Sequence, residues 1–224
     1  MASTTASPVS TTTRPTASTW VGLGIALFAL PLIRQVFRMI NPTPGTALLT
    51  TRELVMFASV VALLLLIRRG EQLPLSSVGL GTSAWWKSVL WGLLAAIVCG
   101  GLAVIVVKVM GSSHDGTSAT FDRAPLWLVT LVMFRAGIAE ELFYRGYSIE
   151  RFRAMGLGKL ASVAIPLVIF AAGHYTGGVT NVVVAGVMGA ILSAFYLWRR
   201  DLVACMFAHT LIDFVANVVP RLGS

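Results

Sequence analysis

Long apolar runs, separated by short polar segments, make up most of this chain from residue 20 onwards. Several of these runs approach the roughly 20 residues that a helix needs to cross a bilayer. Proline, glycine and charged residues interrupt the runs, as in 41–45 and 199–201. This pattern predicts an all-α, polytopic transmembrane helical bundle of about seven spanning helices, or eight if a further helix lies within a long run. The expected spans are 20–40, 53–67, 85–110, a span that starts at 125, 160–174, 181–198 and 202–219.

Composition supports a membrane protein and excludes a soluble one. Hydrophobic residues make up 56% of the chain and charged residues 12%, against about 25% charged residues in a soluble domain. The net charge is +8, but no compact basic cluster is interleaved with aromatic residues, so we expect no nucleic-acid partner. Cys99 and Cys205 lie in apolar runs, and their surroundings predict neither a disulfide framework nor a zinc site.

Three regions differ in composition. Residues 1–19 are mostly Ser, Thr, Ala and Pro, which predicts a disordered N-terminal tail. Residues 20–110 hold the N-terminal transmembrane helices, and residues 125–219 hold a transmembrane core with three polar motifs. Lys and Arg favour the side of the N-terminus by nine to six, so the positive-inside rule places the N-terminus in the cytoplasm. The Arg- and Ala-rich composition of this short chain favours a bacterial plasma membrane, and the oligomeric state stays open.

The first polar motif lies at the end of the apolar run that begins near Pro125. Glu140 and Glu141 are adjacent there, and an unpaired charge in a spanning segment costs several kcal/mol. Neighbours on a helix point about 100° apart. Glu141 and Arg145 are four residues apart, so they share a face and can pair. Glu140 then points elsewhere without an assigned cation; Arg135, one turn earlier, either neutralises the pair or extends to a membrane interface.

Two of the three histidines also lie within predicted spans. His174 ends the fifth span, and His209 shares a helical face with Asp213 in the seventh. The expected helix ends place these side chains near the depth of Glu140, around the middle of the bilayer. One polar pocket could therefore contain all of them. The alternative is an ion-pair cluster that only fixes the packing of the helices.

These motifs together resemble the CPBP family, which includes type II CAAX prenyl endopeptidases and the bacteriocin-processing or self-immunity proteins called Abi. The resemblance covers 125–218 and rests on three motifs in order. They are Glu140-Glu141-x-x-x-Arg145, Phe170-x-x-x-His174 and His209-x-x-x-Asp213. The family takes Asn or Asp at the last position. The resemblance implies an intramembrane glutamate endopeptidase that cleaves membrane-associated peptides or proteins at the lipid bilayer.

The resemblance also implies a role for each motif residue. Glu140 would be the general base that activates water, and His174 would help to hold that water. His209 and Asp213 would stabilise the oxyanion, with Glu141, Arg145 and Phe170 in support. An imidazole can donate a hydrogen bond to a developing oxyanion, whereas an ionised Asp213 would repel it. We therefore expect Asp213 to orient and charge His209, and we expect the site to be approached from the cytoplasm.

Three alternatives to a glutamate endopeptidase would use these residues differently. Zinc could bind Glu140, His174 and His209 with a water as fourth ligand, although the His-Glu-x-x-His motif of zinc proteases is absent; we expect no metal and no other cofactor. A non-enzymatic membrane protein, such as a bacteriocin self-immunity factor or a partner-binding protein, would also carry these spans. A transporter would use intramembrane acids as a proton relay, but no inverted repeat of broken helices is evident.

Overall fold

The computed structural model describes residues 14–81, 84–111 and 123–223. The described residues form helices and connecting turns, with no strand among them. The helices are α1 (Ala17–Ile40), α2 (Thr46–Leu65), α3 (Trp85–Met110), α5 (Leu126–Glu140), α6 (Glu150–Ala154), α7 (Lys159–Ala172), α8 (Gly178–Arg199) and α9 (Leu202–Asn217). Two π-helical segments extend them: η1 (Leu66–Gly70) continues α2, and η3 (Glu141–Ile149) joins α5 to α6. The predicted all-α bundle is confirmed.

Among the described residues, five helices are long and apolar enough to cross a membrane: Ala17–Ile40, Thr46–Gly70, Trp85–Met110, Tyr175–Arg199 and Leu202–Arg221. Two further predicted spans are helical but differ from these. The helix formed by α5, η3 and α6 carries the charged motif, and α7 is a shorter apolar helix of 14 residues. The chain is therefore an integral membrane protein with a polytopic helical bundle.

Two predicted boundaries differ from the structure. Residues 1–13 of the predicted disordered tail lie outside the described residues, but α1 already begins at Ala17 rather than at residue 20. Thr16 and Thr19 cap each other's backbone N–H groups, which starts the helix inside the Ser/Thr-rich segment. The second span is longer than 53–67: α2 begins at Thr46, in agreement with the extension through Ala47 that the shortness of this run suggests, and the helix continues to Gly70.

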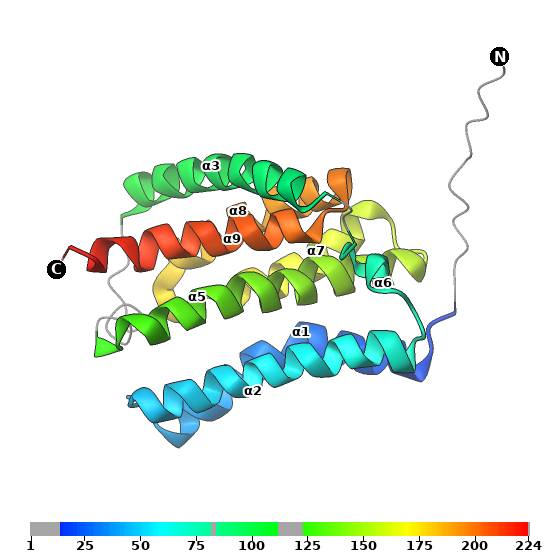
Figure 1. The fold of residues 1–224 in the computed structure, drawn as a ribbon, viewed down its shortest axis with the longest axis horizontal. Coiled ribbons are helices and arrows are strands. Elements are labelled where there is room, and N and C mark those ends of the chain that lie inside the picture. The colour runs from blue at the N-terminus through cyan, green and yellow to red at the C-terminus, as the bar shows by residue number, and fades with distance from the viewer. Residues whose placement is uncertain (1–13, 82–83, 112–122, 224) are drawn as a thin grey trace, which may run out of the picture.

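The helices α5, α7, α8 and α9 lie between α3 on one side and the α1–α2 pair on the other (Figure 1). Helix α3 packs on α8 and α9, α1 packs on α2 and η3, and α2 packs on α5. The predicted N-terminal helices therefore do not form a layer of their own. They flank the core helices on both sides, and α1 and α2 directly contact the helix that carries the two adjacent glutamates.

Glycine allows the closest of these approaches. A Cβ added at Gly137 in α5 would lie 2.9 Å from the backbone nitrogen of Thr210 and 3.0 Å from the carbonyl oxygen of Met206 in α9. Gly189 in α8 is similarly close to Leu167 of α7, at 2.7 Å. Small residues let helix backbones approach in membranes, where packing contributes much of the association energy. The polar residues of α5 and α9 are brought together in this way.

The helices begin and end at two opposite ends of the bundle. Helix α1 begins, and α2–η1, α6 and α8 end, at what we call the N-terminal end (Figure 1, right). Helices α1, α3 and α9 end, and α5 begins, at what we call the far end (Figure 1, left).

Candidate active site

Glu140, the last residue of α5, is 2% exposed and is held by two arginines. Its Oε1 accepts from Arg34 of α1 and from Nη1 of Arg135, at 3.1 Å for the latter. The Nε of Arg135 donates to Oε2 of Glu53 in α2, at 2.7 Å. Of the two roles left open for Arg135, the structure shows the neutralising one: Arg135 pairs with Glu140 from the same helix, and Arg34 adds a second positive charge.

Sequence reasoning missed Arg34 and Glu53 as site residues. Both are charged residues inside apolar helices, and that signal alone marks a residue as a functional candidate. In the balance of nine to six, Arg34 is one of the six Lys and Arg residues on the side opposite the N-terminus. In the structure its side chain is 30% exposed and reaches Glu140 from within α1. Its Nη1 also lies 3.5 Å from the carbonyl oxygen of Gly173, which connects α1 to the segment that carries His174.

His174 follows the end of α7 and faces the second oxygen of Glu140. Its Nε2 lies 3.9 Å from Glu140 Oε2, and its Nδ1 lies 2.8 Å from the carbonyl oxygen of Phe170. A carbonyl oxygen only accepts, so Nδ1 carries a proton. In the neutral ring Nε2 is then the unprotonated nitrogen, which can accept a hydrogen bond from a molecule placed beside Glu140.

Glu141 begins the π-helical segment η3 and faces a different set of partners. Its Oε1 accepts from Arg145 Nη1 at 2.9 Å, which is the predicted pair, and from His209 Nδ1 at 2.7 Å. His209 Nε2 lies 3.5 Å from Asp213 Oδ2. His209 is thus between two carboxylates, and Glu141 is the closer and more buried of them.

The ring of Phe170 lies among these groups and is 4% exposed. Its centroid is 4.8 Å from the ring of His174 and 6.2 Å from the ring of His209. The guanidinium carbon of Arg145 lies 4.2 Å from the same centroid, within cation–π distance. Phe170 therefore packs both histidines and Arg145 in one cluster, so the structure brings all seven predicted site residues together.

Three buried polar atoms in this cluster have no hydrogen-bond partner among the described residues. They are Oε2 of Glu140, Oε2 of Glu141 and Nη2 of Arg145. Buried polar atoms in folded proteins are almost always paired, so an exception needs an explanation such as a ligand site. The π-helical segment supports the same interpretation, because such segments occur frequently at functional sites.

The site has one accessible edge. The side chains of Arg34, His174 and Asp213 are 30%, 22% and 26% exposed. All three lie toward the far end of the bundle, near the ends of α1, α7 and α9. Because α1 begins at the opposite end, a cytoplasmic N-terminus and a cytoplasmic approach to the site exclude each other. The two expectations drawn from the sequence cannot both be correct.

The zinc alternative finds no suitable ligand set in the part of the chain that the structure describes. No group of three His, Cys, Asp or Glu side chains there could hold a metal ion. Both ring nitrogens of His209 face carboxylates, one on Glu141 and one on Asp213. That the reaction needs no metal stays a prediction.

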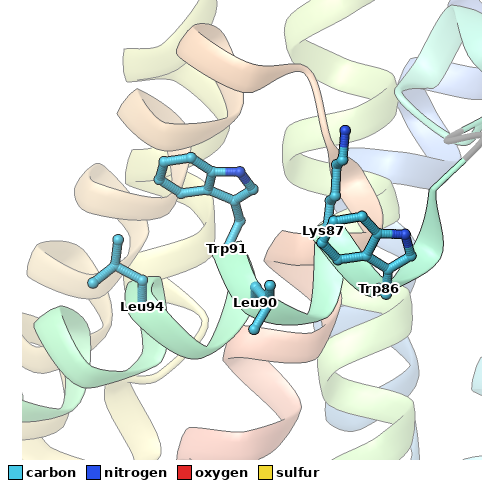
Figure 2. A pocket seen from close by; sticks show the side chains of 5 residues that line it. All are labelled: Trp86, Lys87, Leu90, Trp91 and Leu94. Carbon is cyan, nitrogen blue, oxygen red and sulfur yellow. The ribbon is translucent and has the colours of Figure 1, made fainter.

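A groove on the surface of α3 lies apart from the predicted site residues. It is lined by Trp86, Lys87, Leu90, Trp91 and Leu94 (Figure 2). None of the motif residues lines this groove. Lys87 is the only charged residue among those that line it, so no group of acidic and basic side chains converges there, and the buried cluster at Glu140 is the candidate active site.

Comparison with known proteins agrees with this choice. The family model described as "Type II CAAX prenyl endopeptidase Rce1-like" matches residues 122–215, which contain all three motifs. No curated protein and no solved structure matches the chain. Over residues 122–215 the chain is therefore similar to the Rce1-like type II CAAX prenyl endopeptidases, a family of membrane proteases.

Proposed function

We propose that this protein is an intramembrane endopeptidase in which Glu140 activates a water molecule. One observation carries the proposal: Oε2 of Glu140 is buried without a hydrogen-bond partner among the described residues, and it faces Nε2 of His174 at 3.9 Å. Both arginines bind the other oxygen, Oε1. The carboxylate is therefore ionised, as a base must be, and one of its oxygens stays free to accept a proton.

The proposed reaction uses the two halves of the cluster in different roles. A water oxygen attacks the carbonyl carbon of the peptide bond while Glu140 takes one of its protons and His174 accepts a hydrogen bond from the other. The carbonyl oxygen becomes an oxyanion, which two donors stabilise: Nη2 of Arg145 and Nε2 of a protonated His209, whose Nε2 is 3.5 Å from Asp213 and can turn its proton to the oxyanion. Glu140 then returns its proton to the leaving amine as the C–N bond breaks. The products are a new carboxylic acid, which keeps the second proton of the water, and a new amine; transfer of that proton from the acid to the amine then gives a carboxylate and an ammonium group.

The substrate class follows from the location of the site and from the family. A site among membrane helices fits peptides or proteins associated with the lipid bilayer. The matched family is named for prenylated CAAX proteins, so prenylated peptides belong among the substrates to test. We propose the bacterial plasma membrane as the location and a cytoplasmic N-terminus, in which case the accessible edge of the site faces outward.

The test compares the wild type with Glu140→Gln in detergent, against a library of quenched fluorogenic peptides with and without prenyl groups. Glu150→Gln is the matched control, because Glu150 is a buried glutamate of the same helix that pairs with Arg200 and Tyr196 outside the site. We expect cleavage by the wild type and the control and none by Glu140→Gln. Full activity of folded Glu140→Gln would overturn the proposal. Silence of all three proteins would favour the non-enzymatic self-immunity alternative.

A further inference from the structure

The two N-terminal helices contribute charged groups to the catalytic glutamate, although they lie outside the matched residues 122–215. Glu53 in α2 is fully buried. Its Oε2 accepts from Arg135 Nε at 2.7 Å, and its Oε1 accepts from Arg52 Nε at 2.8 Å. A buried carboxylate this far inside an apolar helix is costly unless it is paired, so its two partners account for its stability there.

Arg135 connects Glu53 to the site through two different nitrogens. Nε faces Glu53 and Nη1 faces Glu140 Oε1, so one planar guanidinium bridges the two carboxylates. The Arg135 side chain is 3% exposed, and its rigid fork fixes the direction of both hydrogen bonds. Glu53 thereby determines which part of Arg135 is available to Glu140.

Rotation of the Glu140 carboxylate decides which oxygen faces His174. The terminal torsion of a glutamate is broad, so the direction in which the second oxygen points depends on what holds the first. Arg34 and Arg135 both bind Oε1, which leaves Oε2 on the side of His174. If Glu53 were absent, Arg135 could turn its fork to both oxygens of Glu140, because paired N–H groups match a carboxylate well.

We propose that Arg34 and Glu53 are positioning residues for the reaction, with Glu53 acting through Arg135. Together they hold Oε1 of Glu140 so that Oε2 stays free for the attacking water. This inference rests on the proposed function of Glu140 as a base. It assigns to α1 and α2 a part in catalysis, beyond that of covering the core helices.

The kinetic test uses one peptide that the wild type cleaves. We expect Arg34→Gln and Glu53→Gln to lower kcat by about 10²-fold, the effect of a misplaced reacting group, with little change in KM. Arg38→Gln is the control for Arg34, since Arg38 is an exposed residue one turn further along α1 that contacts Tyr175. Glu71→Gln is the control for Glu53, because Glu71 also makes a buried ion pair, with Arg151, but away from the site. Both controls should keep the kcat of the wild type in the folded fraction.

A double-mutant cycle separates positioning from a purely structural role. If Glu53 acts through Arg135, Glu53→Gln should lower kcat no further in an Arg135→Gln background. Equal losses in both backgrounds would overturn the link. Should Glu53→Gln fail to fold, Glu53→Asp keeps the charge and should give an intermediate kcat. Wild-type kcat in Arg34→Gln and Glu53→Gln, with Glu140→Gln inactive, would overturn this inference and leave the proposed function intact.

A structure of Glu53→Gln supplies a test that does not depend on activity. We expect the guanidinium of Arg135 to bind both oxygens of Glu140 in that variant. An Arg135 that keeps its single bond to Oε1 would contradict the proposed role of Glu53. Active Glu140→Gln would instead show that the proposed function itself is wrong.

Discussion

His209 in α9 donates a hydrogen bond from Nδ1 to Oε1 of Glu141, over 2.7 Å and inside the bundle. The same oxygen accepts from Arg145, so Oε1 is an acceptor and Nδ1 of His209 carries the proton of this bond. This bond fixes the orientation of the ring. The sequence had assigned that role to Asp213, whose Oδ2 is 3.5 Å from Nε2 and whose side chain is 26% exposed.

Glu141→Gln should therefore impair the enzyme more than Asp213→Asn. We expect Glu141→Gln to lower kcat by about 10²–10⁴-fold, the range for groups that control proton position. Asp213→Asn keeps a polar partner near His209 and should lower kcat by less than about tenfold. The measurement is steady-state cleavage of one fluorogenic peptide, with protein concentration corrected for the folded fraction. A larger loss in Asp213→Asn would return the orienting role to Asp213.

Chelators should leave cleavage unchanged. Both nitrogens of His209 face carboxylates, so the three residues of the zinc alternative do not converge as metal ligands. The measurement is activity after dialysis against EDTA and against phenanthroline, followed by addition of zinc. Activity that disappears with the chelator and returns with zinc would support a metal site instead.

The N-terminus and the accessible edge of the site should be found on opposite sides of the membrane. Two single substitutions to cysteine test this. Thr43 lies between α1 and α2 at the far end, and Lys159 begins α7 at the N-terminal end, so Thr43→Cys and Lys159→Cys report on opposite ends of the bundle. The native cysteines are buried, which keeps background labelling low. With a cytoplasmic N-terminus, an impermeant thiol reagent should label Thr43→Cys in intact cells and Lys159→Cys only after permeabilisation. The reverse pattern would place the site edge in the cytoplasm and the N-terminus outside.

Gly137→Ala should weaken the contact between α5 and α9. The added Cβ would lie 2.9 Å from a backbone nitrogen of α9, which cannot move aside as a flexible side chain can. Overpacking of this kind costs about 1–3 kcal/mol, so the thermal midpoint in detergent should fall. Gly24→Ala is the control, because nothing lies within 4 Å of a Cβ there. An equal thermal midpoint in Gly137→Ala and Gly24→Ala would show that α5 and α9 do not need glycine at position 137 to pack this closely.

The motif residues could be predicted from the sequence because each is a polar group in an apolar run. Such a group is costly to bury without a partner, so a partner is expected nearby. Residues spaced four apart lie on the same face of a helix and can supply it. The pair formed by Glu141 and Arg145 followed from helix geometry in this way. The hydrogen bond between Glu141 and His209 could not be predicted in this way, because the two residues are 68 positions apart in the sequence.

The sequence by itself determined the all-helical membrane fold, since the length and apolarity of each run leave a helix as the form that satisfies its backbone in lipid. It also predicted which residues form the candidate site, because three ordered motifs are more specific than any one. Only the tertiary structure decided which charges meet. Arg34 and Glu53 reach Glu140 and Arg135 through contacts of α1 and α2 with α5 and η3, and no local spacing encodes those contacts. The direction of the accessible edge was decided in the same way, by where α1, α7 and α9 end relative to one another.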